Sequence, residues 1–293
     1  MTLVSGYTAD RELPNGNIEP PGRMPSLISA QEAGVHIAPD LAEIDRNIVF
    51  YIVASASFVE ITSELYTQNL SDFFRDDEDI VGWIGDVWQR EELGHGAQLK
   101  SYVHAAWPDF DWNAAYQRFF DEFSPECAPT AMAASQRQEL VALCVVETGT
   151  ASLYRMLAEA THEPELSRIA TSIANQEIGH YKQFLRHFLR YRSREEMSVL
   201  AILRAVSAQA AAIDGIDAYV AFKHVYLSRN PGTEFTPSAY KAFRKGCRKL
   251  SSRHFPHRMA VKMLLRLLPL PPTLERIIVP PLALMTRLLF VMS

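Results

Sequence analysis

Two glutamate–histidine pairs with identical spacing are the residues in this sequence best suited to chemistry. Glu92 is followed three residues later by His95, and Glu177 is followed three residues later by His180. On an α-helix, residues three apart project from the same face, so each pair presents a carboxylate and an imidazole together. One such pair arises readily by chance, so the spacing alone does not indicate a metal site.

Two more glutamates precede these pairs at matching distances. Glu60 lies 32 residues before Glu92, and Glu147 lies 30 residues before Glu177. Each gap carries the chain along half a helix, around a turn and back to the same level. Bare carboxylates gathered there would repel one another and lose their hydration, which a cation resolves. We therefore predict six metal ligands: Glu60, Glu92, His95, Glu147, Glu177 and His180.

The donor set indicates which metal this site would hold. Oxygen-rich ligation with two imidazoles suits iron or manganese better than structural zinc, and it is the ligand scheme of dinuclear carboxylate helix bundles. Glu159 and His162 share the pair spacing, but they lie at a predicted helix end just before Pro164. We interpret that third pair as solvated.

Hydrophobic periodicity places the predicted ligands on four helices. The first begins near Leu41, where apolar residues start to recur every three to four positions, and ends near Asn69. Acidic residues 76–78 favour the start of the second helix, which runs to Pro108, and Pro164 is tolerated in the first turn of the fourth. The third and fourth helices cover Ala134–Thr161 and Pro164–Tyr191, and the connection 107–134 holds a short helix near Ala114–Phe123. These lengths predict an all-α antiparallel four-helix bundle with one long crossover.

The remaining segments extend this bundle at both ends. Residues 1–40 contain turn signals and are predicted to be an irregular lead-in. A fifth helix over 195–227 completes a bundle domain of residues 41–227. Residues 228–293 form a basic, apolar helical extension, which is broken at Pro256 and at Pro269–Pro272.

Several motifs resemble those of ferritin-like di-iron carboxylate proteins, and among these the soluble acyl-carrier-protein desaturases. The segment WQREELGHGAQLKSY is similar to a desaturase segment with a tryptophan, two glutamates and a histidine–glycine pair. Glu60 followed by Tyr66 matches the first ligand and a downstream tyrosine, which favours Glu60 over Glu64. Glu147 with Thr150 resembles the Glu-x-x-Thr of the third desaturase helix. The resemblance covers about residues 45–190, and the positions that match the tryptophan segment are Trp88, Glu91, Glu92, His95 and Gly96.

Three positions depart from the pattern of many relatives. Gly94 and Gly179 stand where an arginine precedes the histidine, and Gln176 replaces an acidic neighbour. A neutral Gln176 is expected to support its histidine less strongly than a carboxylate would. The paired glycines indicate close packing, a different set of side chains around the ligands, or ordinary sequence drift. A related N-oxygenase subfamily has a further histidine ligand where this chain has Ile173.

The resemblance implies an oxidoreductase with two iron ions that uses dioxygen as co-substrate to desaturate or hydroxylate an acyl chain. Manganese at one or both positions is the alternative metal. Thr150 would hydrogen-bond iron-bound oxygen or relay a proton, or else bond only its own helix backbone. Other functions left open are a di-iron oxygenase, including an N-oxygenase, acting on a small metabolite, and a ferroxidase or metal-handling protein.

Other side chains near these motifs have simpler interpretations. Cys144 is expected to be a small buried hydrophobe, and Trp88 to serve packing or to conduct electrons. Tyr66, Tyr154 and Tyr181 are candidate hydrogen-bond or radical partners, although core tyrosines are common. No flavin, nicotinamide or iron–sulfur motif is present, so electrons would come from an external reductase or ferredoxin.

Charge is distributed unevenly along the chain. Residues 241–293 contain 11 Lys and Arg and one acidic residue, whereas the whole chain has a net charge of −5. The basic tail could attract an acyl carrier protein or an anionic membrane surface, or its helices could cap the bundle. We predict no nucleic-acid partner and leave a homodimer open.

Cysteine usage and the absence of targeting patterns favour a cytoplasmic protein, peripheral at a membrane if the tail binds lipid. The three cysteines share no close spacing, which argues against a disulfide framework. The N-terminal residues lack a secretory pattern, and no unbroken run of about 20 apolar residues predicts a membrane span.

Overall fold

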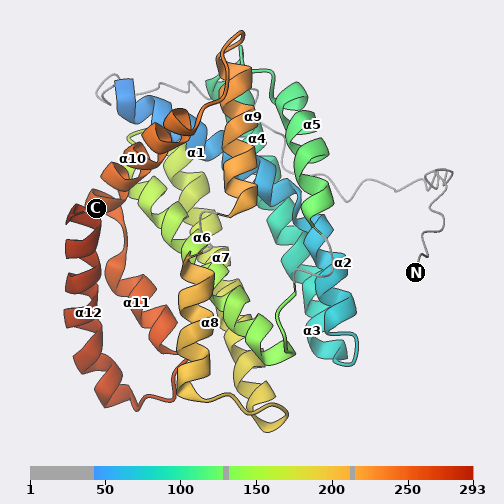
Figure 1. The fold of residues 1–293 in the computed structure, drawn as a ribbon, viewed down its shortest axis with the longest axis vertical. Helices are drawn as coiled ribbons and strands as arrows, with labels where there is room; N and C mark the ends of the chain where they lie inside the picture. The colour runs from blue at the N-terminus through green and yellow to red at the C-terminus, as the bar shows by residue number, and fades with distance from the viewer. Residues whose placement is uncertain (1–42, 128–131, 212–214, 293) are drawn as a thin grey trace, which may run out of the picture. The chain divides into compact units, whose positions relative to one another are not determined.

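The computed structural model describes residues 43–127, 132–211 and 215–292, and within these ranges every regular element is helical. The all-α prediction is therefore confirmed for this part of the chain. The predicted lead-in, residues 1–40, lies outside the described residues. Figure 1 shows the order of the helices along the chain.

Two antiparallel helix pairs carry the predicted ligands. α1 (Glu43–Ile61) packs against α4 (Gln89–Ala106), and α6 (Gln136–Ala160) packs against α7 (Pro164–Arg190) more extensively than any other two helices do (Figure 1). α4 and α7 also contact each other and join the two pairs. α5 (Trp112–Phe123) lies in the predicted connection between the pairs.

Capping residues account for where three of these helices begin. The Ser135 hydroxyl accepts from Gln138 N at 3.2 Å before α6, and the Asp111 carboxylate accepts from Ala114 N at 3.0 Å before α5. The Glu163 carboxylate accepts from Glu165 N and Leu166 N before α7. Each side chain satisfies backbone donors that the first helical turn leaves free. Pro164 is the first residue of α7, as predicted.

The first predicted helix is bent at Thr62. α1 ends at Ile61, α2 covers Ser63–Phe73, and the axes of Arg46–Ile61 and α2 differ by 42°. The Thr62 hydroxyl donates to Val59 O at 2.7 Å and lies 3.2 Å from Phe58 O. Such bonding of a threonine back to its own helix favours a bend. The prediction of a single helix from about Leu41 to about Asn69 was therefore wrong, and Glu60 lies beside the bend.

A π-helical turn interrupts the second predicted helix. α3 (Glu78–Trp83) passes into a π-helical segment, η1 (Ile84–Trp88), before α4 begins. Such turns insert an extra residue into the helix and are common near functional sites. This one ends four residues before Glu92.

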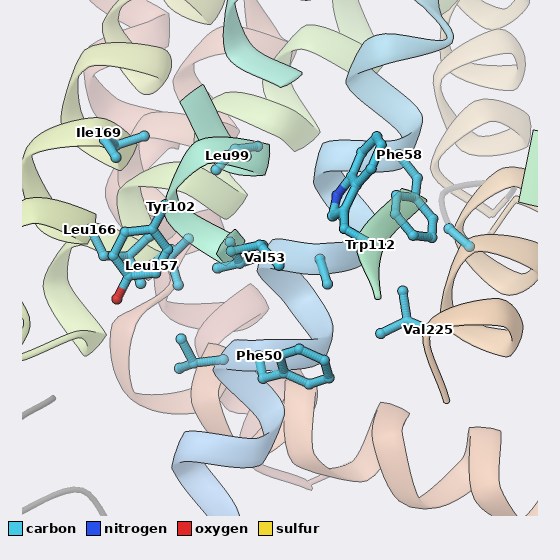
Figure 2. Packing of buried hydrophobic residues seen from close by; sticks show 14 of the residues in the cluster. Phe50, Val53, Phe58, Leu99, Tyr102, Trp112, Leu157, Leu166, Ile169 and Val225 are labelled. Carbon is cyan, nitrogen blue, oxygen red and sulfur yellow. The ribbon is translucent and has the colours of Figure 1, made fainter. Parts of the chain in front are cut away.

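Apolar side chains from the four helices and their neighbours form one large cluster. Figure 2 shows Phe50, Val53 and Phe58 of α1 among side chains from other helices. Buried Trp112 donates from Nε1 to Ser57 Oγ at 2.8 Å, so its polar atom is paired. The other residues labelled in Figure 2 are Leu99, Tyr102, Leu157, Leu166, Ile169 and Val225. This packing sets the relative positions of the helices.

The predicted fifth helix is described as two helices. α8 covers Val199–Ala211 and α9 covers Ile216–Arg229, on either side of undescribed residues 212–214. α9 packs on α1 and α5, whereas α8 packs on α6 (Figure 1). After α9, the chain turns at Gly232, whose φ of 81° is readily adopted by glycine.

Three helices follow, with breaks where prolines predict them. They are α10 (Pro237–His254), α11 (His257–Leu265) and α12 (Pro272–Met292). α10 and α11 both contact α6, and α12 packs on α10 and α11. The piecewise helical tail is confirmed, although Pro280 and Pro281 lie inside α12.

Two stretches in the described part are long and apolar enough to cross a membrane. One is α6, whose apolar window is 67% buried within the protein. The other is Val199–Arg229, which includes undescribed residues and whose apolar window is 7% buried within the protein. The bent pair of α1 and α2 would be a third candidate if counted as one span. The expected absence of a membrane span therefore stays a prediction.

Candidate metal centre

The structure brings all six predicted ligands together in the interior. One comes from α1, two from α4, one from α6 and two from α7. None of the six is more than 8% exposed. They are Glu60 on α1, Glu92 and His95 on α4, Glu147 on α6, and Glu177 and His180 on α7.

The six residues form two overlapping groups, each suited to one metal ion. In each group, one ligand atom per residue lies within 4.8 Å of the others. Glu92 and Glu177 belong to both groups. Glu60 and His95 complete the first group, and Glu147 and His180 complete the second. Each group could hold a metal ion, and the Glu92 and Glu177 carboxylates would be available to either group.

His95 presents one ring nitrogen to the carboxylates and the other to an outer side chain. Its Nδ1 lies 3.2 Å from Glu177 Oε1 and 3.6 Å from Glu60 Oε2. Its Nε2 lies 3.1 Å from Gln176 Oε1. Because an amide oxygen only accepts, this contact assigns a proton to Nε2, and Nδ1 faces inward, where it can carry a second proton or bind a cation.

His180 repeats this arrangement with a carboxylate as its outer partner. Its Nδ1 lies 3.1 Å from Glu92 Oε1 and 3.5 Å from both Glu147 Oε2 and Glu177 Oε2. Its Nε2 lies 2.7 Å from Glu91 Oε2. The outer acceptor again assigns the proton to Nε2.

Orphaned polar atoms show that these residues fit a metal ion. His95 Nδ1, His180 Nδ1 and Glu177 Oε1 are buried and make no hydrogen bond. A buried acceptor without a partner is costly, and a cation that accepts its lone pair removes that cost. These buried groups could therefore hold a metal.

Without a metal, the site would have to hold protons. Burial raises the pKa of Glu92 and Glu147 well above the usual range, and the Glu177 carboxylate raises both further. Burial lowers the pKa of His95, but the neighbouring Glu177 and Glu60 carboxylates outweigh it and raise that pKa to about 11. A metal ion would displace these protons and supply the missing positive charge.

Three hydroxyl or indole donors hold the carboxylates from outside. Trp88 Nε1 donates to Glu147 Oε1 at 3.0 Å, and the Tyr154 hydroxyl donates to Glu60 Oε1. The Thr150 hydroxyl donates to Glu177 Oε2 at 3.0 Å. Such outer contacts fix the rotamers of ligating side chains.

Thr150, the predicted catalytic residue, lies at the site and also contacts its own helix. Its hydroxyl is 3.2 Å from Glu147 O and 3.3 Å from Val146 O. Both interpretations of this threonine therefore have a geometric basis. Trp88, expected to serve packing, packs on Phe184 and also makes a polar contact to a predicted ligand.

The structure also separates the alternative residues from the site. Glu64 is exposed, which supports the choice of Glu60. Glu159 and His162 are both exposed, so their interpretation as a solvated pair is confirmed. Cys144 is fully buried and belongs to neither ligand group, and burial raises the pKa of its thiol.

The other candidate tyrosines contact different parts of the protein. The Tyr181 hydroxyl donates to Met263 O at 2.5 Å, and Tyr66 packs against the Phe123 ring. Trp83 was not predicted to lie at the site. The centroid of its ring lies 6.0 Å from that of the His180 ring, with 70° between the two ring planes. Trp83 is the last residue of α3, directly before the π-helical segment η1.

Close helix packing occurs at a different glycine from those suggested by the sequence. A Cβ added to Gly94 or Gly179 would meet nothing within 4 Å. A Cβ on Gly96 would lie 2.8 Å from Ile61 N and 3.2 Å from Glu60 Cβ. Close packing, one of the interpretations of Gly94 and Gly179, is therefore wrong, and the other two stay open. Gly96 lets α4 approach the backbone of α1 beside a predicted ligand.

No protein-family model, curated protein or solved structure matches this chain. The resemblance to di-iron proteins therefore depends on the quoted motifs. What the structure supplies independently is an all-helical fold with buried glutamate and histidine groups.

Proposed function

We propose that this chain is a non-haem di-iron oxidoreductase that activates dioxygen. The observation that carries the proposal is the pair of buried ligand groups that share Glu92 and Glu177. In this proposal, α1, α4, α6 and α7 form a ferritin-like four-helix bundle, and the segment with α5 is its long crossover.

The donor set favours iron. Four carboxylates and two imidazoles suit iron or manganese, and the same residues would hold either metal. Bound iron would supply dioxygen activation and the removal of hydrogen from an unactivated carbon. The protein would orient the ligands through Glu91, Gln176 and Trp88, and its buried interior would exclude bulk water.

Thr150 is the residue we assign to proton handling. Its hydroxyl bonds a carboxylate shared by both ligand groups. It is only partly buried, unlike the ligands around it, so it lies between the site and the outside. A hydroxyl in this position can hold a proton or pass it inward.

We propose an acyl chain, carried on an acyl carrier protein, as the substrate, on the strength of the motif resemblance. Desaturation would remove two hydrogen atoms and reduce dioxygen to water, with two further electrons and protons from an external reductase or ferredoxin. The N-oxygenase alternative lacks support at Ile173, which is fully buried in the apolar cluster.

Metal content and turnover test the proposal together. The chain is purified without oxygen, loaded with ferrous iron, and analysed for bound metal before and after Glu147→Ala. We expect two iron ions per wild-type chain and a clear loss in the variant. Less than one ion per wild-type chain would exclude the metal site.

Turnover then distinguishes the activities. Oxygen uptake coupled to oxidation of an acyl carrier substrate, with a reductant present, supports the proposed reaction. Iron oxidation that continues without any organic substrate and deposits ferric mineral would indicate a ferroxidase instead. Oxidation of a small amine or other metabolite in place of the acyl chain would indicate an oxygenase that acts on a small metabolite.

A matched pair of threonine variants tests the proton role. Thr150→Val removes the hydroxyl that contacts Glu177, whereas Thr148→Val removes one that donates to Cys144 O at 2.7 Å. We expect only Thr150→Val to uncouple oxygen uptake from product, with iron content unchanged in both. Equal coupling in the two variants would contradict the assignment.

A further inference from the structure

α12 exposes a row of large apolar side chains to solvent. Ile277 is 69% exposed, Leu284 is 58%, and Leu288 is 53%. Leu274 and Met285 are also exposed. Leu274, Ile277, Leu284 and Leu288 are separated by three, seven and four residues, and Met285 lies three residues before Leu288, so these side chains share one face of the helix. An apolar row of this length on the surface marks a binding face.

The opposite face of α12 is the one that holds the helix to the protein. Val279 is buried, and Thr286 Oγ1 lies 3.1 Å from His257 Nδ1 on α11. The Phe290 ring stacks on Phe255 with centroids 5.0 Å apart. The exposed row is therefore not needed to pack the helix against its neighbours.

A basic cleft adjoins this row. A cavity of about 550 Å³ lies between the start of α11 and α12, and its lining includes Leu284 of the exposed row. Arg253, Arg258 and Arg287 all line it, and no acidic residue does. Within the described residues, none of these three arginines pairs with a carboxylate. Three guanidinium groups beside an open cleft favour an anionic ligand.

Residues 241–293, which include α11 and α12, are also strongly basic, with 11 Lys and Arg. Their single acidic residue, Glu275, lies 3.6 Å from Arg266 and is therefore already paired. The rest of the chain holds 18 Lys and Arg against 33 acidic residues, so the net positive charge lies in residues 241–293, which include most of α10 and all of α11 and α12. A charged surface of this kind attracts partners of the opposite sign.

We propose that α12 and the adjoining cleft bind an anionic membrane surface. The apolar row would enter the boundary between head groups and acyl chains, and the arginines would contact lipid phosphates. A second copy of this chain would set the arginines against one another, whereas a bilayer accepts the whole apolar row. This binding does not depend on the metal centre.

Vesicle co-sedimentation of the full chain tests the proposal. The probes are vesicles of phosphatidylcholine alone and of phosphatidylcholine mixed with phosphatidylglycerol, at low and high salt. We expect binding to the mixed vesicles only, weakened by salt. Arg258→Glu with Arg287→Glu should weaken that binding by at least about tenfold. Arg75→Glu with Arg118→Glu, the same charge change at exposed positions elsewhere, should leave it unchanged.

The apolar contribution has its own matched variants. Leu284→Ser with Leu288→Ser should weaken binding, whereas Leu200→Ser with Leu203→Ser on exposed positions of α8 should not. Unchanged melting temperature and helical content would show that each variant remains folded.

Three results would overturn the proposal. The first is equal binding to neutral and anionic vesicles, and the second is an equal loss in the α8 and α12 variants. The third is no vesicle binding at all together with a dimer, or a complex with an acidic carrier protein, that the α12 variants disrupt. That last result would assign the surface to a protein partner.

Discussion

The two halves of the candidate metal centre differ in what supports their histidines. In the half built on α1 and α4, His95 bonds the neutral amide of Gln176. In the half built on α6 and α7, His180 bonds the Glu91 carboxylate. Each outer partner comes from the opposite helix pair, so the histidines tie the pairs together. A carboxylate partner makes an imidazole a stronger ligand than an amide does, so the halves are chemically unequal.

The halves also differ in how their helices approach each other. The residue after His95 is Gly96, which permits backbone contact between α4 and α1. The residue after His180 is Tyr181, which is buried and donates to Met263 O. In the first half, the two helices approach closely because Gly96 has no side chain. In the second half, the large Tyr181 side chain extends to α11 and contacts it. Similar ligands can thus be positioned by different packing.

The largest expected effect comes from a ligand that both halves share. Glu177→Ala removes a carboxylate from both groups, so we expect both metal ions to be lost. Elemental analysis after anaerobic iron loading measures this. Glu64→Ala, at an exposed position on α2, is the control and should bind as much iron as the wild type. Full iron content in Glu177→Ala would show that the shared carboxylate is not a ligand.

Changing Glu91 or Gln176, the outer partners of the two histidines, should change the difference in metal affinity between the two halves. Glu91→Gln should lower metal affinity at the His180 half by about 10–100-fold, because outer-partner changes have effects of this size. Gln176→Glu should raise affinity at the His95 half and bring the halves closer together. Competition with a ferrous chelator under anaerobic conditions measures both affinities. A change in the same direction in both variants would contradict the comparison.

The packing difference predicts a stability effect at Gly96. Gly96→Ala would press a methyl group against Ile61 N and Glu60 Cβ, so we expect a loss of about 1–3 kcal/mol in unfolding free energy. Urea unfolding of the metal-free chain measures it. An unchanged or higher stability would show that α1 and α4 can separate at no cost.

The smallest effects are expected at the two glycines that precede the histidines. Gly94→Ala and Gly179→Ala place a methyl group in open space within a helix, so each should gain about 1 kcal/mol. The same urea titration measures the gains, which should be similar because the two positions are equivalent. A loss at either one would reveal a contact between that position and another part of the chain.

Much of the fold was predictable from local sequence patterns. The start of α7 follows from Pro164, and the extents of α6 and α7 follow from their apolar periods, because proline effects and side-chain periodicity are local. The bend at Thr62 and the π-helical turn over Ile84–Trp88 were missed. A single threonine or one extra residue in a helix barely changes the periodicity of the apolar residues, so this periodicity does not reveal the bend or the π-helical turn.

For the site, the sequence by itself determined which residues could meet. Four spacings and two identical half-motifs indicate the six positions, because helix geometry brings such positions to one depth, and the motif resemblance favours Glu60 over Glu64. Their interpretation as iron ligands stays a prediction.

Only the tertiary structure decided how the chosen side chains point. It placed both Nδ1 atoms inward, Tyr154 against Glu60 at a separation of 94 residues, and the close approach at Gly96. These features depend on contacts between segments far apart in the chain. No local periodicity encodes them, because they arise only when the two helix pairs pack together.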